Sequence, residues 1–160
     1  MNTTTNKSSL VAITLGLSGK DYKKILQSWN ILKNKHNIDF ISSRSPKPHI
    51  TIISGYTKNL SLLKKKISKL YFKRFNLRSA GLGVFLIKNP LIYIRWEKNL
   101  SLTKLYELAD KNFSKKIFKK TKFSGSFYWL PKTTIAYKDL KIKNLDKIFK
   151  SLKNISKPIS

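Results

Sequence analysis

Residues 48–56, PHITIISGY, and residues 131–137, PKTTIAY, repeat one short pattern within the same chain. Each begins with a proline, continues with two further residues and then reads Thr-Ile. The position after the proline is His49 in the upstream copy and Lys132 in the downstream copy. Both stretches are rich in β-branched residues, which are typical of strands. The sequence therefore predicts two related strands, each with its own polar side chains near the start.

Alternation along these strands decides which side chains lie together. Successive side chains of a strand point to opposite faces. His49 and Thr51 are therefore expected on one face of the first strand, and Lys132 and Thr134 on one face of the second. If the two halves of the chain are related by approximate symmetry, the four side chains converge on a common cleft.

Short strands and helices are expected to alternate around the two motifs, from the spacing of apolar and turn-forming residues. In the first half we expect a buried strand over 10–17, a helix with Asp21 as its N-cap, a loop or ragged strand over 38–47 and a strand over 49–56. A helix capped by Asn59 should follow, with Leu62, Leu63, Ile67 and Leu70 as its buried stripe. In the second half we expect two strands joined by a glycine-bent segment within 75–87, a strand over 91–97, a helix from 101 or 102, a strand over 133–137 and a short helix over 145–152.

The halves 10–72 and 75–152 share this outline, which predicts an α+β fold rather than a doubly wound sheet. We expect residues 1–9 to form a flexible tail. Residues 10–155 are expected to form a single domain of two pseudo-symmetric lobes. The expected lobes contain two antiparallel-rich sheets with helices on their outer faces.

Composition points to a polyanionic partner. The 160 residues include 34 Lys and Arg against seven Asp and Glu, a formal charge of +27. Self-repulsion on this scale opposes a compact monomer unless a partner neutralises it. RNA or DNA is the first candidate for that partner, and an anionic membrane surface is the second. The absence of Cys excludes disulfides and thiolate metal sites, and two His residues make a metal site an unfavoured choice.

The opening residues, MNTTTNKSSLVAITLGLSG, lack the layout of a signal peptide or a transit peptide. We therefore expect the chain to act where it is made or to be encoded inside an organelle. Lys, Asn and Ile are abundant, as an AT-rich coding sequence would produce. Both features favour a mitochondrial location, with the cytoplasm as the alternative.

The motif pair resembles the two His-x-Thr signatures of the 2H phosphoesterases, a superfamily that includes the RNA ligase-like cyclic phosphodiesterases. The resemblance covers most of the chain: the strand–helix opening, PHITI, FNLRSAGLGVF, YIRWE, and PKTTIA preceded by FYWLP. Each motif alone is short. The two stand in the expected order about 80 residues apart.

The resemblance implies a fold, a reaction and a site. Active members cleave 2′,3′-cyclic phosphates and related 2′-5′ linkages in RNA. One His deprotonates the attacking group, the other protonates the leaving oxygen, and the two Thr hydroxyls hold the phosphate. Carried over to this chain, His49, Thr51 and Thr134 match the family pattern, and no cofactor is implied.

Lys132 departs from that pattern, because the second His is missing. The reaction favours imidazoles, since a pKa near 6.5 permits both proton donation and proton acceptance near neutrality. Lysine has a reference pKa of about 10.4. With Lys132, the ancestral catalytic set is expected to hold a phosphate and to turn it over poorly or not at all.

Basic clusters lie outside the motifs and alternate with apolar residues at helical spacing. Contacts from such residues to phosphates position RNA without reading its sequence. The candidate RNA-binding residues are Arg44, Lys64, Lys65, Lys66, Lys115, Lys116, Lys119, Lys120 and Lys122. The competing interpretation is that these are solvated helix faces.

Three functional hypotheses follow. The first is an RNA-binding protein with a degenerate 2H-like site, a pseudoenzyme within a ribonucleoprotein such as an organellar ribosome, with rRNA and neighbouring proteins as partners. The second is an active 2′,3′-cyclic phosphodiesterase or 2′-5′ RNA ligase-like enzyme in which Lys132 replaces the second His. The third, weaker hypothesis is attachment to a membrane surface through Lys-rich helices.

Overall fold

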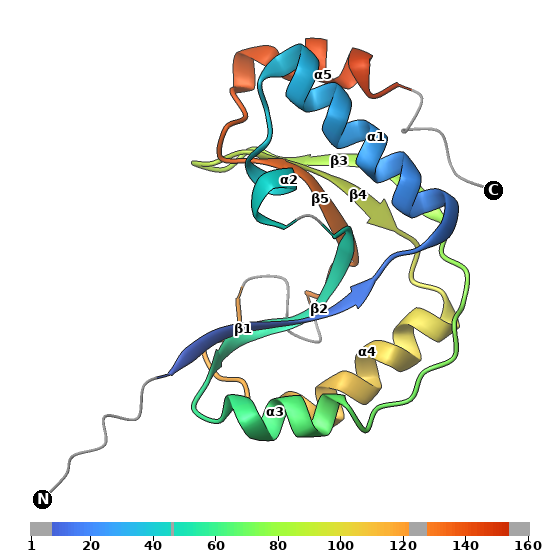
Figure 1. The fold of residues 1–160 in the computed structure, drawn as a ribbon, viewed down its shortest axis with the longest axis vertical. Coiled ribbons are helices and arrows are strands. Elements are labelled where there is room, and N and C mark those ends of the chain that lie inside the picture. The colour runs from blue at the N-terminus through green and yellow to red at the C-terminus, as the bar shows by residue number, and fades with distance from the viewer. Residues whose placement is uncertain (1–7, 46, 122–127, 154–160) are drawn as a thin grey trace, which may run out of the picture. The chain divides into compact units, whose positions relative to one another are not determined.

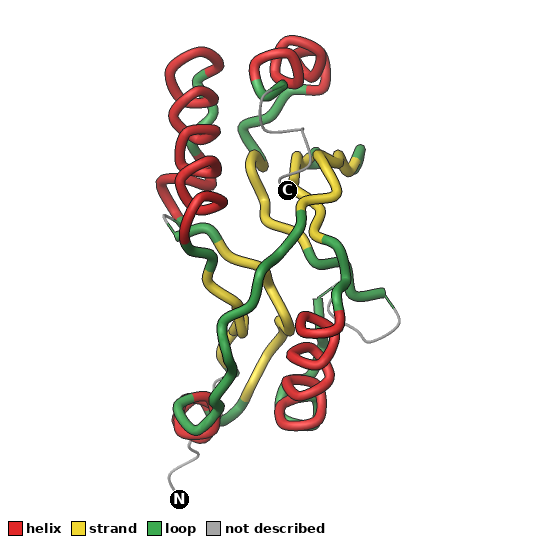
Figure 2. The backbone as a smooth tube through the Cα atoms, turned by 90° about the vertical axis from the view of Figure 1, so that its right-hand side faces the viewer, coloured by secondary structure: helices red, strands yellow, loops and turns green. Residues whose placement is uncertain are grey.

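A computed structural model describes residues 8–45, 47–121 and 128–153 and shows an α+β chain (Figure 1). Two antiparallel sheets are present in these residues, one formed by β1 and β2 and the other by β3, β4 and β5 in that order. Figure 2 distinguishes the helices from the strands along the same chain. The strands are β1 (Ser9–Gly16), β2 (His49–Thr57), β3 (Ser79–Phe85), β4 (Leu91–Trp96) and β5 (Lys132–Tyr137). The helices are α1 (Gly19–His36), α2 (Phe40–Arg44), α3 (Leu60–Ile67), α4 (Leu100–Phe113) and α5 (Leu145–Ser151), with a 3-10 turn over Ile142–Asn144.

The chain divides into two compact units, each of which takes residues from both halves of the sequence. The first unit takes its described residues from Met1–Thr14, Thr51–Asn76 and Lys98–Leu130, and the second from Leu15–Ile50, Leu77–Glu97 and Pro131–Ser160. Strand β2 passes from the second unit into the first between Ile50 and Thr51.

The second unit is built on the three-stranded sheet. In β4, Ile92, Ile94 and Trp96 form a buried apolar face, and Tyr93 on the other face is buried as well. Helix α1 contacts both β5 and α5, and Figure 1 shows the two helices on the same side of the sheet. The C-terminal end of α1 is fastened to α5 by a hydrogen bond of 2.8 Å between His36 Nε2 and Ser151 Oγ.

In the first unit, α4 buries one face and the segment after it pairs with β2. Helix α4 buries Leu102, Tyr106, Ala109 and Phe113, which recur at helical spacing. The segment after α4 pairs with β2 through two hydrogen bonds between the backbones of Tyr56 and Phe118. Gly55 is required at this approach, because a Cβ there would lie 2.7 Å from the Phe118 carbonyl oxygen.

Several local predictions are confirmed. Strand β2 begins at His49, and β5 covers the second motif. Asn59 caps α3, since its side chain accepts a hydrogen bond of 2.8 Å from the Leu62 N–H.

The start of α1 was predicted wrongly. The N-cap is Ser18 and the helix begins at Gly19, so Asp21 lies inside the first turn. A carboxylate there interacts favourably with the positive end of the helix dipole. Burial raises the pKa of Asp21, and the neighbouring Lys24 partly offsets this.

The prediction of a buried strand over 10–17 is also wrong in part. Strand β1 is present, but its side chains alternate between half-buried and exposed, and 64% of Leu10 is exposed. Among the residues that the structure describes, its only strand partner is β2. A continuous apolar run therefore overstated the burial of a strand at the edge of a small sheet.

Residues 38–47 contain a helical turn, α2, where a loop or ragged strand was predicted. Residues 75–87 contain the single strand β3 instead of two strands, with an irregular register between Ser79 and Leu82. Gly81 has a φ of 93° in this irregular part, and glycine adopts that conformation without a steric cost.

The predicted apolar stripe of α3 is mostly not buried. Of its four residues only Leu63 is buried, whereas Leu62 and Ile67 are exposed and Leu70 is intermediate. Helix α3 therefore contacts the first unit along a narrow stripe and leaves apolar surface beside its lysines.

Candidate functional site

The second motif lies on β5 with its two polar side chains on one face. Thr133 and Ile135 are buried, while Lys132 and Thr134 are half-buried. The register places Tyr93 of β4 opposite Thr134, and Ile92 opposite Ala136. Ile135 is therefore an extra residue in β5, a bulge directly after the motif threonine.

The first motif begins β2, and His49 is held by its own loop. The Nδ1 atom of His49 lies 2.9 Å from the carbonyl oxygen of Lys47. A carbonyl oxygen can only accept, so Nδ1 donates and the neutral ring carries its proton there. The Nε2 atom is left as the nitrogen that can accept or donate a proton toward a ligand.

A buried chain of hydrogen bonds fastens His49 to β5. The indole Nε1 of Trp96 donates to Thr133 Oγ1 at 2.9 Å. The Thr133 hydroxyl donates in turn to the backbone carbonyl of His49 at 3.0 Å. These contacts set the start of the first motif beside the second motif, 84 residues away in sequence.

Thr51, the remaining residue of the predicted set, belongs to the first unit. Its carbonyl oxygen accepts a hydrogen bond of 3.0 Å from the indole Nε1 of Trp129. Trp129 stacks on Tyr106, with ring centroids 4.4 Å apart. The site described here therefore rests on His49, Lys132 and Thr134, and the convergence of Thr51 with them stays a prediction.

A pocket of about 180 Å³ adjoins this part of the second unit. Its lining residues are Trp29, Ile41, Ser45, Pro48, His49, Thr133 and Thr134. Trp29 is 4% exposed, and its indole N–H has no hydrogen-bond partner among the described residues. An unpaired buried donor costs free energy that an acceptor in the pocket recovers. The sequence placed Trp29 only on the apolar face of a helix, so this donor was missed.

Lys132 lies opposite a second cation. The register of β4 and β5 places Arg95 directly across from Lys132. Side chains opposite each other in antiparallel strands share a face, and like charges there repel. No ion pair joins either residue to a carboxylate in the described part of the chain. Burial lowers the pKa of Lys132, because it disfavours the charged form.

Arg95 was also missed from the sequence. In the sequence Arg95 lies within LIYIRWE, whose near alternation predicts only a strand over 91–97. The partner strand and its register, which bring Arg95 to Lys132, are not encoded in that local pattern.

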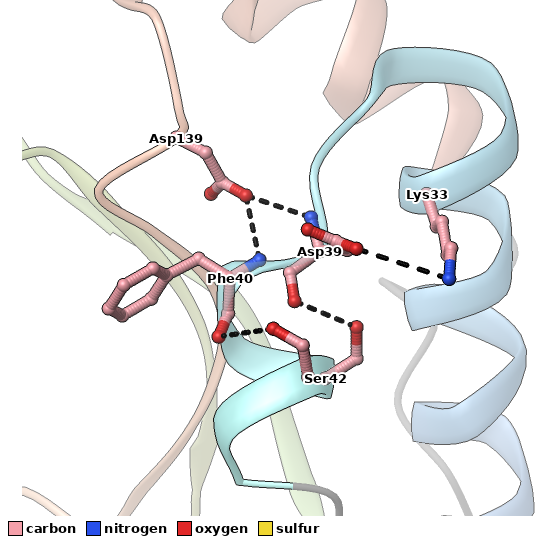
Figure 3. Close-up of polar contacts among 6 residues, drawn as sticks. Lys33, Asp39, Phe40, Ser42 and Asp139 are labelled. Atoms are coloured by element: carbon pink, nitrogen blue, oxygen red, sulfur yellow. Dashed lines mark hydrogen bonds and ion pairs between the residues drawn. The ribbon is translucent and has the colours of Figure 1, made fainter.

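Helix α2 lines the pocket with Ile41. Its first turn is anchored by Asp139, which follows β5 (Figure 3). Asp139 Oδ2 accepts hydrogen bonds from the backbone N–H groups of Asp39 and Phe40, at 2.8 and 2.7 Å. The Phe40 ring also packs edge-on against Tyr137 of β5, with centroids 6.0 Å apart. Because Asp139 is 100 residues from Asp39, the cap of α2 cannot be found by local sequence rules.

The predicted RNA-binding residues fall into different environments. Arg44 is exposed and lies over the Phe40 ring, 5.2 Å from its centroid. Lys120 is already engaged, since its ammonium lies 3.3 Å from Asp110 and donates to Ser114 Oγ at 2.7 Å. Lys122 lies outside the described residues. The others are exposed or half-buried, namely Lys64, Lys65, Lys66, Lys115, Lys116 and Lys119.

Two further searches give negative results for the part of the chain that the structure describes. No group of three His, Cys, Asp or Glu side chains is arranged to hold a metal ion. No helix there combines the length and apolar character that crossing a membrane requires. Comparison with protein-family models, curated proteins and solved structures finds no significant match to this chain.

Proposed function

We propose that this chain is an RNA-binding protein on a 2H phosphoesterase-like fold with a degenerate active site. The observation that carries the proposal is the cross-strand pair of Lys132 and Arg95 beside Thr134. Two cations held opposite each other without a carboxylate are stabilised by an anion between them. A phosphodiester supplies that anion.

The two motif strands support the fold part of the proposal. From His49 to Ser54, residues alternate between half-buried and buried in the same order as from Lys132 to Tyr137. Matching burial in two strands of matching sequence is what a pseudo-symmetric 2H-like fold requires.

The charge of the whole chain supports RNA as the source of the phosphate. Against a formal charge of +27, three ion pairs join Lys to Asp in the described residues. The remaining cations repel one another unless a polyanion lies among them. A ribonucleoprotein is the setting we propose, with rRNA of an organellar, mitochondrial ribosome as its principal partner.

Substitution of the second imidazole explains why the site would hold RNA and not cut it. General acid–base catalysis by one positioned group contributes about 10²–10⁴ in rate. Lys132 contributes a positive charge and a hydrogen-bond donor in its place. With His49 and Thr134, it provides contacts to phosphate oxygens and one competent proton-transfer group.

An active phosphodiesterase is the second candidate, and two observations favour it. His49 presents Nε2 because Nδ1 is bonded to Lys47. Burial lowers the pKa of Lys132, which moves it toward the range in which it exchanges protons. In this alternative Lys132 replaces the second His of a 2′,3′-cyclic phosphodiesterase or 2′-5′ RNA ligase-like enzyme.

Fractionation of the native source tests the proposed function. The protein is followed through a density gradient at physiological salt, with and without ribonuclease. We expect the protein to migrate with a large particle and to be released from it by ribonuclease. Migration as a free monomer in both gradients would contradict the proposal.

A further inference from the structure

The first unit contains helices α3 and α4 (Figure 1). A hollow of about 400 Å³, which we call the α3–α4 groove, is bordered by residues of α3, of the turn after it and of α4. It is lined by Leu62, Lys65, Lys66, Lys69, Leu70 and Asn112. None of these residues belongs to the motif site, which lies in the second unit. The groove is therefore a separate feature that the proposed site does not use.

The charge of the groove is uncompensated. The turn after α3 continues to Lys69, whose N–H bonds the Lys66 carbonyl, so Lys65, Lys66 and Lys69 gather on one side of the helix end. Like charges at this spacing on a helix repel one another. None of the three forms an ion pair with a carboxylate of the described residues. The nearest part of α4 contributes Asn112, while Asp110 of the same helix is paired with Lys120.

The helix dipole explains why these cations are tolerated but not why a hollow lies between them. Cations near the C-terminal end of a helix are favoured. That effect needs only an exposed lysine, whereas Lys66 is half-buried and lines the groove. The arrangement suits a ligand that enters the groove.

The apolar part of the groove restricts the type of ligand. Leu62 is 39% exposed, and Leu70 lines the hollow beside the lysines. Asn112 donates its amide N–H to the Leu108 carbonyl at 2.7 Å, so its own carbonyl oxygen is the group left to accept a hydrogen bond. Unpaired nucleotides combine phosphates, flat apolar base faces and N–H or 2′-OH donors in one ligand.

We propose that the α3–α4 groove binds a short segment of single-stranded RNA, with phosphates on the three lysines and a base against the two leucines. The inference deepens the proposed RNA-binding function and rests on it. It distinguishes Lys65, Lys66 and Lys69 from Lys64, which is exposed on the same helix but does not line the groove.

Binding of a labelled oligouridylate to the full-length protein, measured by fluorescence anisotropy over a range of KCl concentrations, tests the inference. The groove variant is K65Q/K66Q/K69Q. The matched control is K141Q/K143Q/K147Q, which removes three exposed lysines from the second unit. Thermal unfolding checks that both variants remain folded, as expected for changes at side chains outside the core.

The groove variant is expected to lose at least about tenfold in affinity, and its plot of log affinity against log salt is expected to flatten by about 2. The second figure is three phosphate contacts multiplied by about 0.7 for a single strand. The control variant and K64Q are expected to change both quantities much less. In addition, 4-thiouridine in the RNA is expected to crosslink within residues 62–70.

Each alternative outcome has a distinct meaning. Equal losses in the two triple variants, or crosslinks only outside residues 62–70 and 112, would overturn the groove while leaving RNA binding intact. Failure of the wild-type protein to bind any RNA would overturn the proposed function and the groove together. Tight binding to phosphatidylserine vesicles with no RNA binding would identify the lysines as a membrane-facing surface instead.

Discussion

The two motif copies have the same pattern of burial but different chemistry. In β2 the residue after the motif proline is His49, whose ring is oriented by the Lys47 carbonyl. In β5 it is Lys132, half-buried and opposite Arg95. The same order of buried and half-buried residues therefore carries an imidazole in one strand and an ammonium group in the other. Binding and turnover can therefore be tested separately in this molecule.

The largest effect, on catalytic activity, is expected from giving both motif copies a histidine. Lys132→His places at this position an imidazole with a reference pKa near neutrality. If the strands keep the 2H arrangement, hydrolysis of RNA ending in a 2′,3′-cyclic phosphate should rise by about 10²–10⁴-fold over wild type. The ring-opened product is quantified by chromatography. The double variant H49A/K132H should lose the gain, and a folded, RNA-binding K132H protein without any gain would refute the proposed arrangement.

The next largest effect is expected from the hydrogen bonds that join the two motif strands. Thr133→Val removes the hydroxyl that joins the buried Trp96 indole N–H to the His49 carbonyl, so both groups lose this partner. Unfolding in urea should show a loss of about 2–4 kcal/mol. Thr134→Val, one position further on, should change stability by no more than about 0.5 kcal/mol and should weaken RNA binding instead. Equal stability losses in the two variants would contradict the role assigned to Thr133.

A smaller loss of stability is expected from a change at the start of helix α2, which lines the pocket. Asp139→Ala removes the acceptor of two backbone N–H groups at the start of α2. We expect a loss of about 2 kcal/mol in unfolding free energy, together with faster hydrogen exchange in residues 39–44. The control is Asp146→Ala, whose exposed ion pair with Lys150 contributes about 0.3–0.5 kcal/mol. If both variants lose the same amount, Asp139 does not anchor the helix.

Lys132 itself should carry a stability cost in the absence of RNA. Burial lowers its pKa below the ordinary value of 10.5, so the folded protein binds this proton less tightly than the unfolded chain. The contribution of Lys132 to stability therefore rises with pH up to about that value.

The corresponding experiment is Lys132→Met. Near neutral pH and without RNA, the melting temperature should rise, on the order of a few degrees. The advantage over wild type should shrink as the pH approaches 10.5. RNA affinity should fall at the same time. A lower melting temperature for Lys132→Met at pH 7 would contradict this cost and show that a neighbouring group stabilises the lysine.

Local features of the molecule could be predicted from the sequence, and long-range features could not. The two motif strands and the Asn59 cap depend on neighbouring residues, and both are present. The cap of α2 depends on Asp139, a residue 100 positions away. No periodicity or turn signal reports such a contact.

The candidate site shows the same limit. The alternation of polar side chains predicted that Lys132 and Thr134 share a face, as they do. Arg95 and Trp29 were missed because their roles depend on strand register and on a pocket formed by distant segments. Their residue types alone gave no signal, since each also suits an ordinary strand or helix.

The most direct test of the central claim follows RNA ending in a 2′,3′-cyclic phosphate on the wild-type protein. Affinity and the fraction of opened rings are measured in the same samples, beside His49→Ala. We expect salt-sensitive binding with the cyclic phosphate intact, and the same low level of ring opening in both proteins. Ring opening by wild type that disappears in His49→Ala would contradict the proposed binding role and identify the chain as an enzyme.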